Sequence, residues 1–253
     1  GGAINCVVYA FDVPGIFSLI TGLLSASGFN IRSGSIYTYA RESTEEISTV
    51  RKWRKPRRLV YTREKPRLII DRFSGSLRSD TSFSKWRSDF TGHLDRMFGL
   101  LPAGGEKTIA DARQYVYETV AKTLPGWRLE TAKVLYPAEI SVDKGVRTRL
   151  TILSEDTPFF LFSVSNALAL YGFSIESVSI RTIGNRIEDH IEITDVDGGP
   201  ITDEALLNQA KMSVLLTKQF TYFLGTAPDP YAALVRFETI SRDLARIPPE
   251  SSW

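Results

Sequence analysis

Residues 4–38 read INCVVYAFDVPGIFSLITGLLSASGFNIRSGSIYT, and residues 148–182 read TRLTILSEDTPFFLFSVSNALALYGFSIESVSIRT. The second stretch begins 144 residues after the first (148 minus 4), and ten of the 35 aligned positions are identical without a gap. A duplication of this length predicts two copies of one small domain, because the units of a solenoid recur at shorter periods. The identical pairs are Asp12/Asp156, Pro14/Pro158, Leu24/Leu168, Gly28/Gly172, Phe29/Phe173, Ile31/Ile175, Ser33/Ser177, Ser35/Ser179, Ile36/Ile180 and Thr38/Thr182.

Both copies carry the same succession of secondary-structure signals. In the first copy, β-branched and aromatic residues at 4–11 predict a strand, which ends at 12–15 (Asp-Val-Pro-Gly) before a helix with apolar residues at helical spacing. Gly28 is placed to end that helix in a left-handed conformation, and residues 29–39 predict the next strand. The second copy repeats this order, with Thr157 as the expected N-cap of its helix.

The segments around the second copy extend the pattern. Strands at 173–182 and 186–194, followed by an amphipathic helix at 202–224, complete the order strand, helix, strand, strand, helix. This order predicts an α+β fold of two ferredoxin-like βαββαβ units, with helices on one face of an antiparallel sheet. The predicted domains are a first unit at 1–101 with a basic insertion at about 41–67, a connecting helix and strand at 102–142, a second unit at 143–225 and a C-terminal helical tail at 226–253.

Composition favours a soluble chain without a disulfide or a cofactor. The 253 residues are 43% hydrophobic, enough for a sizeable core, and no apolar run approaches the roughly 20 residues that cross a bilayer. Cys6 is the only cysteine, which excludes an internal disulfide and a cysteine-based zinc site and favours a cytoplasmic location. The opening Gly-Gly-Ala, without a methionine, predicts a fragment of a longer protein.

The net charge of +2 conceals a strongly basic segment. Residues 51–72 carry ten Lys or Arg against two acidic residues, a surplus of eight, so the rest of the chain sums to −6. Cations around an aromatic are typical of nucleic-acid or phosphate-binding surfaces, although a solvated hairpin shows the same pattern. The aromatic run of RNA-recognition folds is missing from 68–73 and 186–194, which argues against nucleic acid. A solvated hairpin is the favoured interpretation, and among binding roles a docking surface for an acidic protein partner or for a parent protein's catalytic region is preferred over nucleic acid. The residues of this surface are Arg51, Lys52, Trp53, Arg54, Lys55, Arg57 and Arg58.

A strand, Asp-x-Pro-Gly, an apolar helix, a glycine and a second strand that opens with Asn-Ile together resemble the ACT domain, the small-molecule sensing module of amino-acid metabolism. Two such units in tandem look like the C-terminal regulatory region of bacterial PII uridylyltransferases, or of glutamine synthetase adenylyltransferases that contain ACT domains. The resemblance covers about two thirds of the chain. The matching residues are Asp12, Pro14, Gly15, Ile16, Phe17, Gly28, Asn30 and Ile31, which recur in part as Asp156, Pro158, Gly172 and Ile175.

The resemblance implies a regulatory chain that senses an amino acid, with glutamine as the ligand of the uridylyltransferases, and that is not itself an enzyme. Amides at a helix N-terminus would favour the ligand carboxylate, and Asp12 could meet its ammonium. Phe159 replaces the glycine of the first copy, which implies a filled or altered second site. The implied first site is Asp12, Val13, Pro14, Gly15, Ile16, Phe17, Asn30 and Ile31, and the second is Asp156, Thr157, Pro158, Phe159 and Ser174.

Signals for catalysis or a metal are weak. Asp195 and Asp197 lie about 120 residues from the turn at Gly75, whereas nucleotidyltransferases hold these features close together. His93 and His190 have no recognisable local partner for a triad or a metal site. The sequence therefore predicts ligand binding and regulation, through two units that pack together or dimerise. The alternative is a ligand-free interaction or dimerisation module that docks through its basic hairpin, since an aspartate before a helix is commonly a plain cap.

Overall fold

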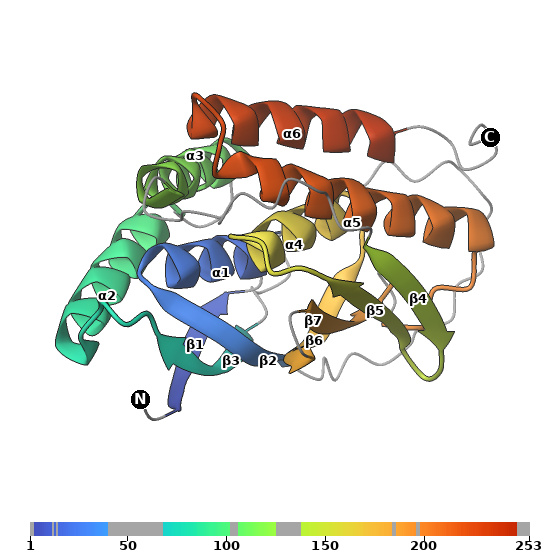
Figure 1. Cartoon of the computed structure of the whole chain (residues 1–253), viewed down its shortest axis with the longest axis horizontal. Coiled ribbons are helices and arrows are strands. Elements are labelled where there is room, and N and C mark those ends of the chain that lie inside the picture. The colour runs from blue at the N-terminus through green and yellow to red at the C-terminus, as the bar shows by residue number, and fades with distance from the viewer. Residues whose placement is uncertain are drawn as a thin grey trace, which may run out of the picture.

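The computed structural model describes residues 3–39 except 12 and 14, 68–101, 106–124, 138–183, 186–195 and 198–246. Within these residues the chain is α+β, as predicted, with one seven-stranded antiparallel sheet and six helices (Figure 1). The strands are β1 (Ile4–Phe11), β2 (Phe29–Tyr39), β3 (Leu68–Leu77), β4 (Glu139–Lys144), β5 (Thr148–Ser154), β6 (Ser174–Ile183) and β7 (Arg186–Thr194). The helices are α1 (Ile16–Ala26), α2 (Phe83–Gly99), α3 (Glu106–Thr123), α4 (Phe160–Leu170), α5 (Glu204–Leu224) and α6 (Pro230–Ala245).

Both halves of the chain contribute to the same sheet. The strand order is β1-β3-β2-β6-β7-β5-β4, so the first-half strands form one side and the second-half strands the other. At the second-half edge, β4 from the predicted connecting segment pairs with β5. The predicted division into two ferredoxin-like units stays a prediction.

The helices cover one face of the sheet (Figure 1). Strand β1 shows why, because its residues alternate between the two faces with period two. Val8 and Ala10 are buried on the helix side, whereas Val7, Tyr9 and Phe11 are exposed on the other. Burial of each apolar row against the helices supplies the main stabilisation of this layer.

The two halves meet through a short junction between β2 and β6. Only three residue pairs join these strands: Ser33 with Ser179, Gly34 with Val178 and Ser35 with Ser177. Gly34 and Val178 are counterparts in the duplication, so the junction has the register of an approximate two-fold axis. On the helix layer, the Ser18 hydroxyl donates to the carbonyl of its own counterpart, Phe162, at 3.0 Å.

The hydrophobic core consists of two clusters, and each is contacted by residues from the other half of the chain. The first-half cluster includes Phe159 and Phe162 from the second copy, and the second-half cluster is contacted by Phe17 and Ile36 from the first. Helix α6 packs against α3, α4 and α5, with Leu234 buried, and forms the layer farthest from the sheet (Figure 1). None of the helices in the described ranges combines the length and the apolar character required to span a membrane.

One local prediction is wrong. Thr157 does not cap α4; its hydroxyl instead shares a hydrogen bond of 2.9 Å with the Thr221 hydroxyl on α5. The N-cap position belongs to Phe159, which makes no side-chain capping bond. Thr157 is buried against α5, and a partner there satisfies its hydroxyl at the cost of the cap.

Candidate functional site

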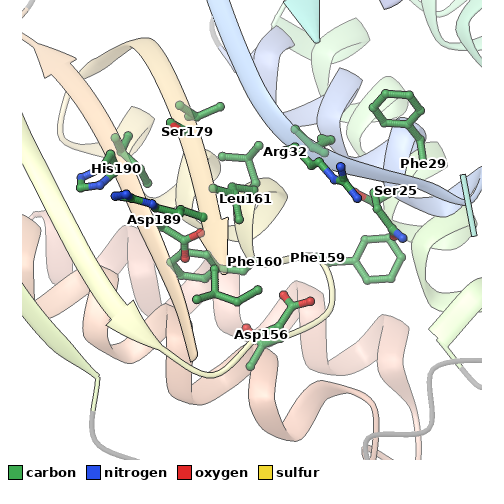
Figure 2. Close-up of a pocket in the computed structure, with 18 of the residues that line it drawn as sticks. Ser25, Phe29, Arg32, Asp156, Phe159, Phe160, Leu161, Ser179, Asp189 and His190 are labelled. Carbon is green, nitrogen blue, oxygen red and sulfur yellow. The ribbon is translucent and has the colours of Figure 1, made fainter. Parts of the chain in front are cut away.

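A cavity of about 640 Å³ lies where the two halves meet. Beyond the three pairs of the junction, Asn30, Ile31 and Arg32 of β2 line one wall, and β6 and β7 line the other. The loop between β5 and α4 closes one side through Asp156 and Phe159 (Figure 2). The cavity therefore combines the second strand of the first copy with the strand-to-helix loop of the second.

Asn30 reaches the cavity through an irregularity in β2. The register against β3 shifts between Ile31 and Ser33, which marks a β-bulge. On β3, a Cβ atom at Gly75 would lie 2.1 Å from the Asn30 carbonyl oxygen, so only glycine permits this approach. Asn30 itself is exposed, and its side chain is free to meet a ligand at the cavity wall.

The loop of the second copy keeps the backbone conformation of the first. Phe159 has φ 58° and ψ 21°, close to the φ 82° and ψ 4° of Gly15. This left-handed conformation costs a residue with a Cβ roughly 1–2 kcal/mol. The Phe159 ring is only 4% exposed and packs into the first-half cluster, and burial of that size offsets the strain. Phe159 also lines the cavity, and whether it fills or alters a second ligand site stays a prediction.

Acidic and basic side chains from the second half meet at the cavity. Asp189 on β7 is buried and lines the cavity, and its Oδ2 lies 3.6 Å from Nζ of Lys218 on α5. Lys218 is also buried, and its Nζ lies 3.9 Å from the centroid of the Phe160 ring. Asp156 remains exposed toward the cavity and acts on both ionised groups through its charge.

The surroundings shift the pKa values of all three groups. Burial raises the pKa of Asp189 to about 6, against the opposing attraction of Lys218. Crowding by surrounding protein atoms raises the pKa of Asp156 even though its surface is accessible from the cavity, and Lys218 again opposes the shift. Burial lowers the pKa of Lys218, which both aspartates counteract. Perturbed groups at a cavity are a common feature of functional sites.

Arginines line the opposite part of the cavity. Arg32 extends from β2 beside Ser25, across the cavity from the carboxylates of Asp156 and Asp189 (Figure 2). Arg78 also lines the cavity and forms an ion pair of 3.6 Å with Asp80. Arg181 of β6 also lines the cavity, on the side of Asp189. A cavity that presents both carboxylates and guanidinium groups offers partners to both charges of a zwitterion.

Only some residues of each of the two predicted ligand sites line the cavity. From the first set it contains Asn30 and Ile31, and from the second set Asp156, Thr157 and Phe159. The other described members do not line it: Ile16 is buried, Phe17 is packed between the clusters, and Val13, Gly15, Pro158 and Ser174 lie elsewhere. Asp12, Pro14 and the basic residues Arg51, Lys52, Trp53, Arg54, Lys55, Arg57 and Arg58 lie outside the described residues.

Sequence reasoning missed Asp189, Lys218 and Arg32. The structure shows a correspondence that the constant offset conceals: the identical residues Ile36 and Ile180 pair with Asp71 and Asp189 on the neighbouring strands. Asp71 is fully buried as well, so each half keeps an aspartate at the same place in its third strand. No comparable signal marks Lys218, since its role depends on how α5 crosses the sheet.

No protein-family model matches the chain. Over 203 residues, 79% of this chain and 18% of the relative, it is 25% identical to the bifunctional uridylyltransferase/uridylyl-removing enzyme of Rhodospirillum rubrum. The chain resembles bacterial uridylyltransferase/uridylyl-removing enzymes. The enzyme of this name from Pseudomonas putida is 26% identical over 105 residues, 40% of this chain and 11% of the relative. That of Xanthomonas campestris pv. campestris is 34% identical over 61 residues, 24% of this chain and 7% of the relative.

These matches confirm the resemblance to uridylyltransferases drawn from the sequence. Each of these relatives is a bifunctional uridylyltransferase/uridylyl-removing enzyme by name. The chain spans less than a fifth of the length of each relative.

Proposed function

We propose that this chain is the tandem ACT region of a nitrogen-metabolism nucleotidyltransferase, that it senses an amino acid, and that glutamine is the ligand. The ligand site is the cavity between the halves. In this proposal the chain itself is regulatory and cytoplasmic, and catalysis belongs to another region of a uridylyl- or adenylyltransferase. Its partner is that catalytic region or an acidic protein.

The cavity at the junction carries this proposal. Its walls come from both copies of the duplicated segment, so a bound ligand would contact the β2 and β6 sides at once. Because three residue pairs join those strands, a ligand in the cavity would add contacts between the two halves beside this short junction. Binding would shift the arrangement of the halves only by the difference in affinity between the arrangements.

The test is isothermal titration of the purified chain with L-glutamine and with a panel of other amino acids. We expect saturable binding that is lost in Asn30→Trp, because the indole would occupy the cavity next to Arg32. The matched control is Asn208→Trp, an exposed site on α5 away from the cavity, which should bind like the wild type. Gly15→Trp is a poorer blocking variant, since φ at Gly15 is 82° and any side chain is strained there.

A second candidate is a ligand-free interaction module. Apolar side chains from β1, β2 and β3 are exposed on the sheet face opposite the helices, and such patches commonly bind other proteins. They are Val7, Tyr9, Phe11, Tyr37 and Leu68, between 41% and 64% exposed. Absence of heat from every amino acid, with a folded wild-type chain by circular dichroism, would reject the sensor and favour this module.

A further inference from the structure

The carboxylate of Asp189 is incompletely satisfied. Its side chain is 8% exposed, and its Oδ2 accepts no hydrogen bond from any residue in the described ranges. The cation beside it, Lys218 Nζ, is 3.6 Å away, within ion-pair distance but beyond a good hydrogen bond. This oxygen is itself buried, although Asp189 lines the cavity, and a buried carboxylate oxygen without a hydrogen-bond donor is costly.

The negative charges of Asp156 and Asp189 exceed the positive charge of Lys218, which favours binding of a further cation beside them. Asp156 and Asp189 carry two negative charges when ionised, and Lys218 supplies one positive charge that is attracted to both. Another cation at this wall, Arg181, has a different partner, because it lies 3.8 Å from Glu188. Without a ligand, a proton is the simplest compensation, which agrees with the raised pKa of Asp189.

We infer that Asp189, together with Asp156, accepts an ammonium group of the ligand, and that Lys218 is the positioning residue which holds Asp189 at the cavity. This inference rests on the proposed function and adds the ligand class: the cavity selects primary amines over analogues that lack the amine. Arg32, across the cavity, meets the carboxylate of the same ligand (Figure 2). A ligand without the ammonium leaves two carboxylates to share the single charge of Lys218, and this penalty is the source of the selectivity.

Lys218 gives the site a connection to the helix layer. It belongs to α5, which packs against α4 and α6, whereas Asp189 belongs to the sheet. When a ligand ammonium enters between the aspartates, it repels Lys218 and competes for the same oxygens. A bound ligand therefore changes the electrostatic interactions of Lys218, and this single side chain links the cavity to α5.

The test compares amino acids with their deaminated analogues by isothermal titration at pH 7.5. The pairs are L-glutamine with glutaramate, L-glutamate with glutarate, and L-phenylalanine with 3-phenylpropanoate. In the wild type, the amino acid that binds should do so about tenfold or more tightly than its analogue. In Asp189→Asn this preference should fall to within about twofold, through weaker binding of the amino acid and unchanged binding of the analogue.

Asp111→Asn is the matched control, because Asp111 is an exposed aspartate on α3, and it should keep the wild-type preference. Lys218→Arg provides a conservative rescue: the cation is kept, so the preference should remain, whereas it should shrink in Lys218→Met. An Asp189→Asn protein that binds the amino acid with undiminished preference would overturn this inference and leave the sensor function standing. Failure of every amino acid to bind the folded wild type would overturn both.

Discussion

At the scale of single residues, the strand-to-helix loops show how one backbone conformation is built from two different residues. Gly15 adopts φ 82° without a side chain, and Phe159 adopts φ 58° with a large one. Glycine reaches this region freely, whereas Phe159 is held there because its ring is buried in the core of the other half. The same backbone therefore has a local cause in the first copy and a tertiary cause in the second.

Gly15→Ala should destabilise the chain by about 1 kcal/mol, from backbone strain alone. A Cβ atom at Gly15 meets nothing within 4 Å, so no clash contributes. Gly92→Ala is the matched control: Gly92 is an exposed position inside α2, also with nothing within 4 Å, and alanine should stabilise it by about 0.5–1 kcal/mol. Urea unfolding followed by circular dichroism measures both, and equal effects of the two substitutions would contradict the assigned strain.

Lys218→Met should destabilise the chain by about 3–5 kcal/mol at pH 7, because it leaves the Asp189 carboxylate buried without its counter-ion. The pKa of Asp189 is raised to about 6 in the folded chain, so its protonated form stabilises folding below its ordinary pKa and this contribution is lost as the pH rises through 6. The cost of the substitution should therefore be smaller at pH 5 than at pH 7.

Urea titrations at the two pH values give this difference directly. Lys85→Met removes an exposed ion pair with Asp89 and should change stability by no more than about 0.5 kcal/mol at either pH. A penalty for Lys218→Met that is the same at pH 5 and pH 7 would count against a buried, ionised Asp189.

At the scale of elements, the junction of β2 and β6 decides where the cavity lies. The strands pair only along Ser33 to Ser35 and separate beyond, so the cavity begins where their hydrogen bonding ends. Gly34 sits at the centre of this junction and opposes Val178. A Cβ atom there would lie 2.9 Å from Val178 Cγ2 and 3.3 Å from Phe73 Cδ1, so the absence of a side chain lets the halves approach.

Gly34→Val should push β2 from β6, with a loss of about 1–3 kcal/mol in stability, as expected for overpacking. Because the cavity is framed by the same strands, amino-acid binding should weaken in parallel. Gly145→Val is a suitable control, since a Cβ atom at Gly145 in the β4–β5 turn would lie 3.7 Å from the Arg147 carbonyl oxygen, an ordinary contact distance. Urea unfolding and titration calorimetry report the two effects, and a Gly34→Val protein with wild-type stability and binding would exclude the junction as their common origin.

At the scale of the whole molecule, the duplication produces an approximate two-fold arrangement with unlike halves. The outer sheet face of the first half is apolar at Val7, Tyr9 and Phe11, whereas that of the second half carries ion pairs such as Arg149 with Glu192 at 2.7 Å. The ammonium-accepting site lies on the second half and the exposed apolar face on the first. The two halves can therefore serve different tasks, ligand binding and contact with another protein.

The amino-acid sequence by itself determined the duplication, the α+β class and most elements, because hydrophobic periodicity, glycines and prolines act locally along the chain. The resemblance to the ACT domain also pointed to Asn30 and Asp156, both of which line the cavity. Only the tertiary structure brought these two residues into one site, because the cavity crosses the copies. The same holds for Asp189 and Lys218, which are 29 residues apart (218 minus 189) and meet only because α5 packs over β7. Local patterns encode elements, but which charges share a buried space depends on the packing of distant elements.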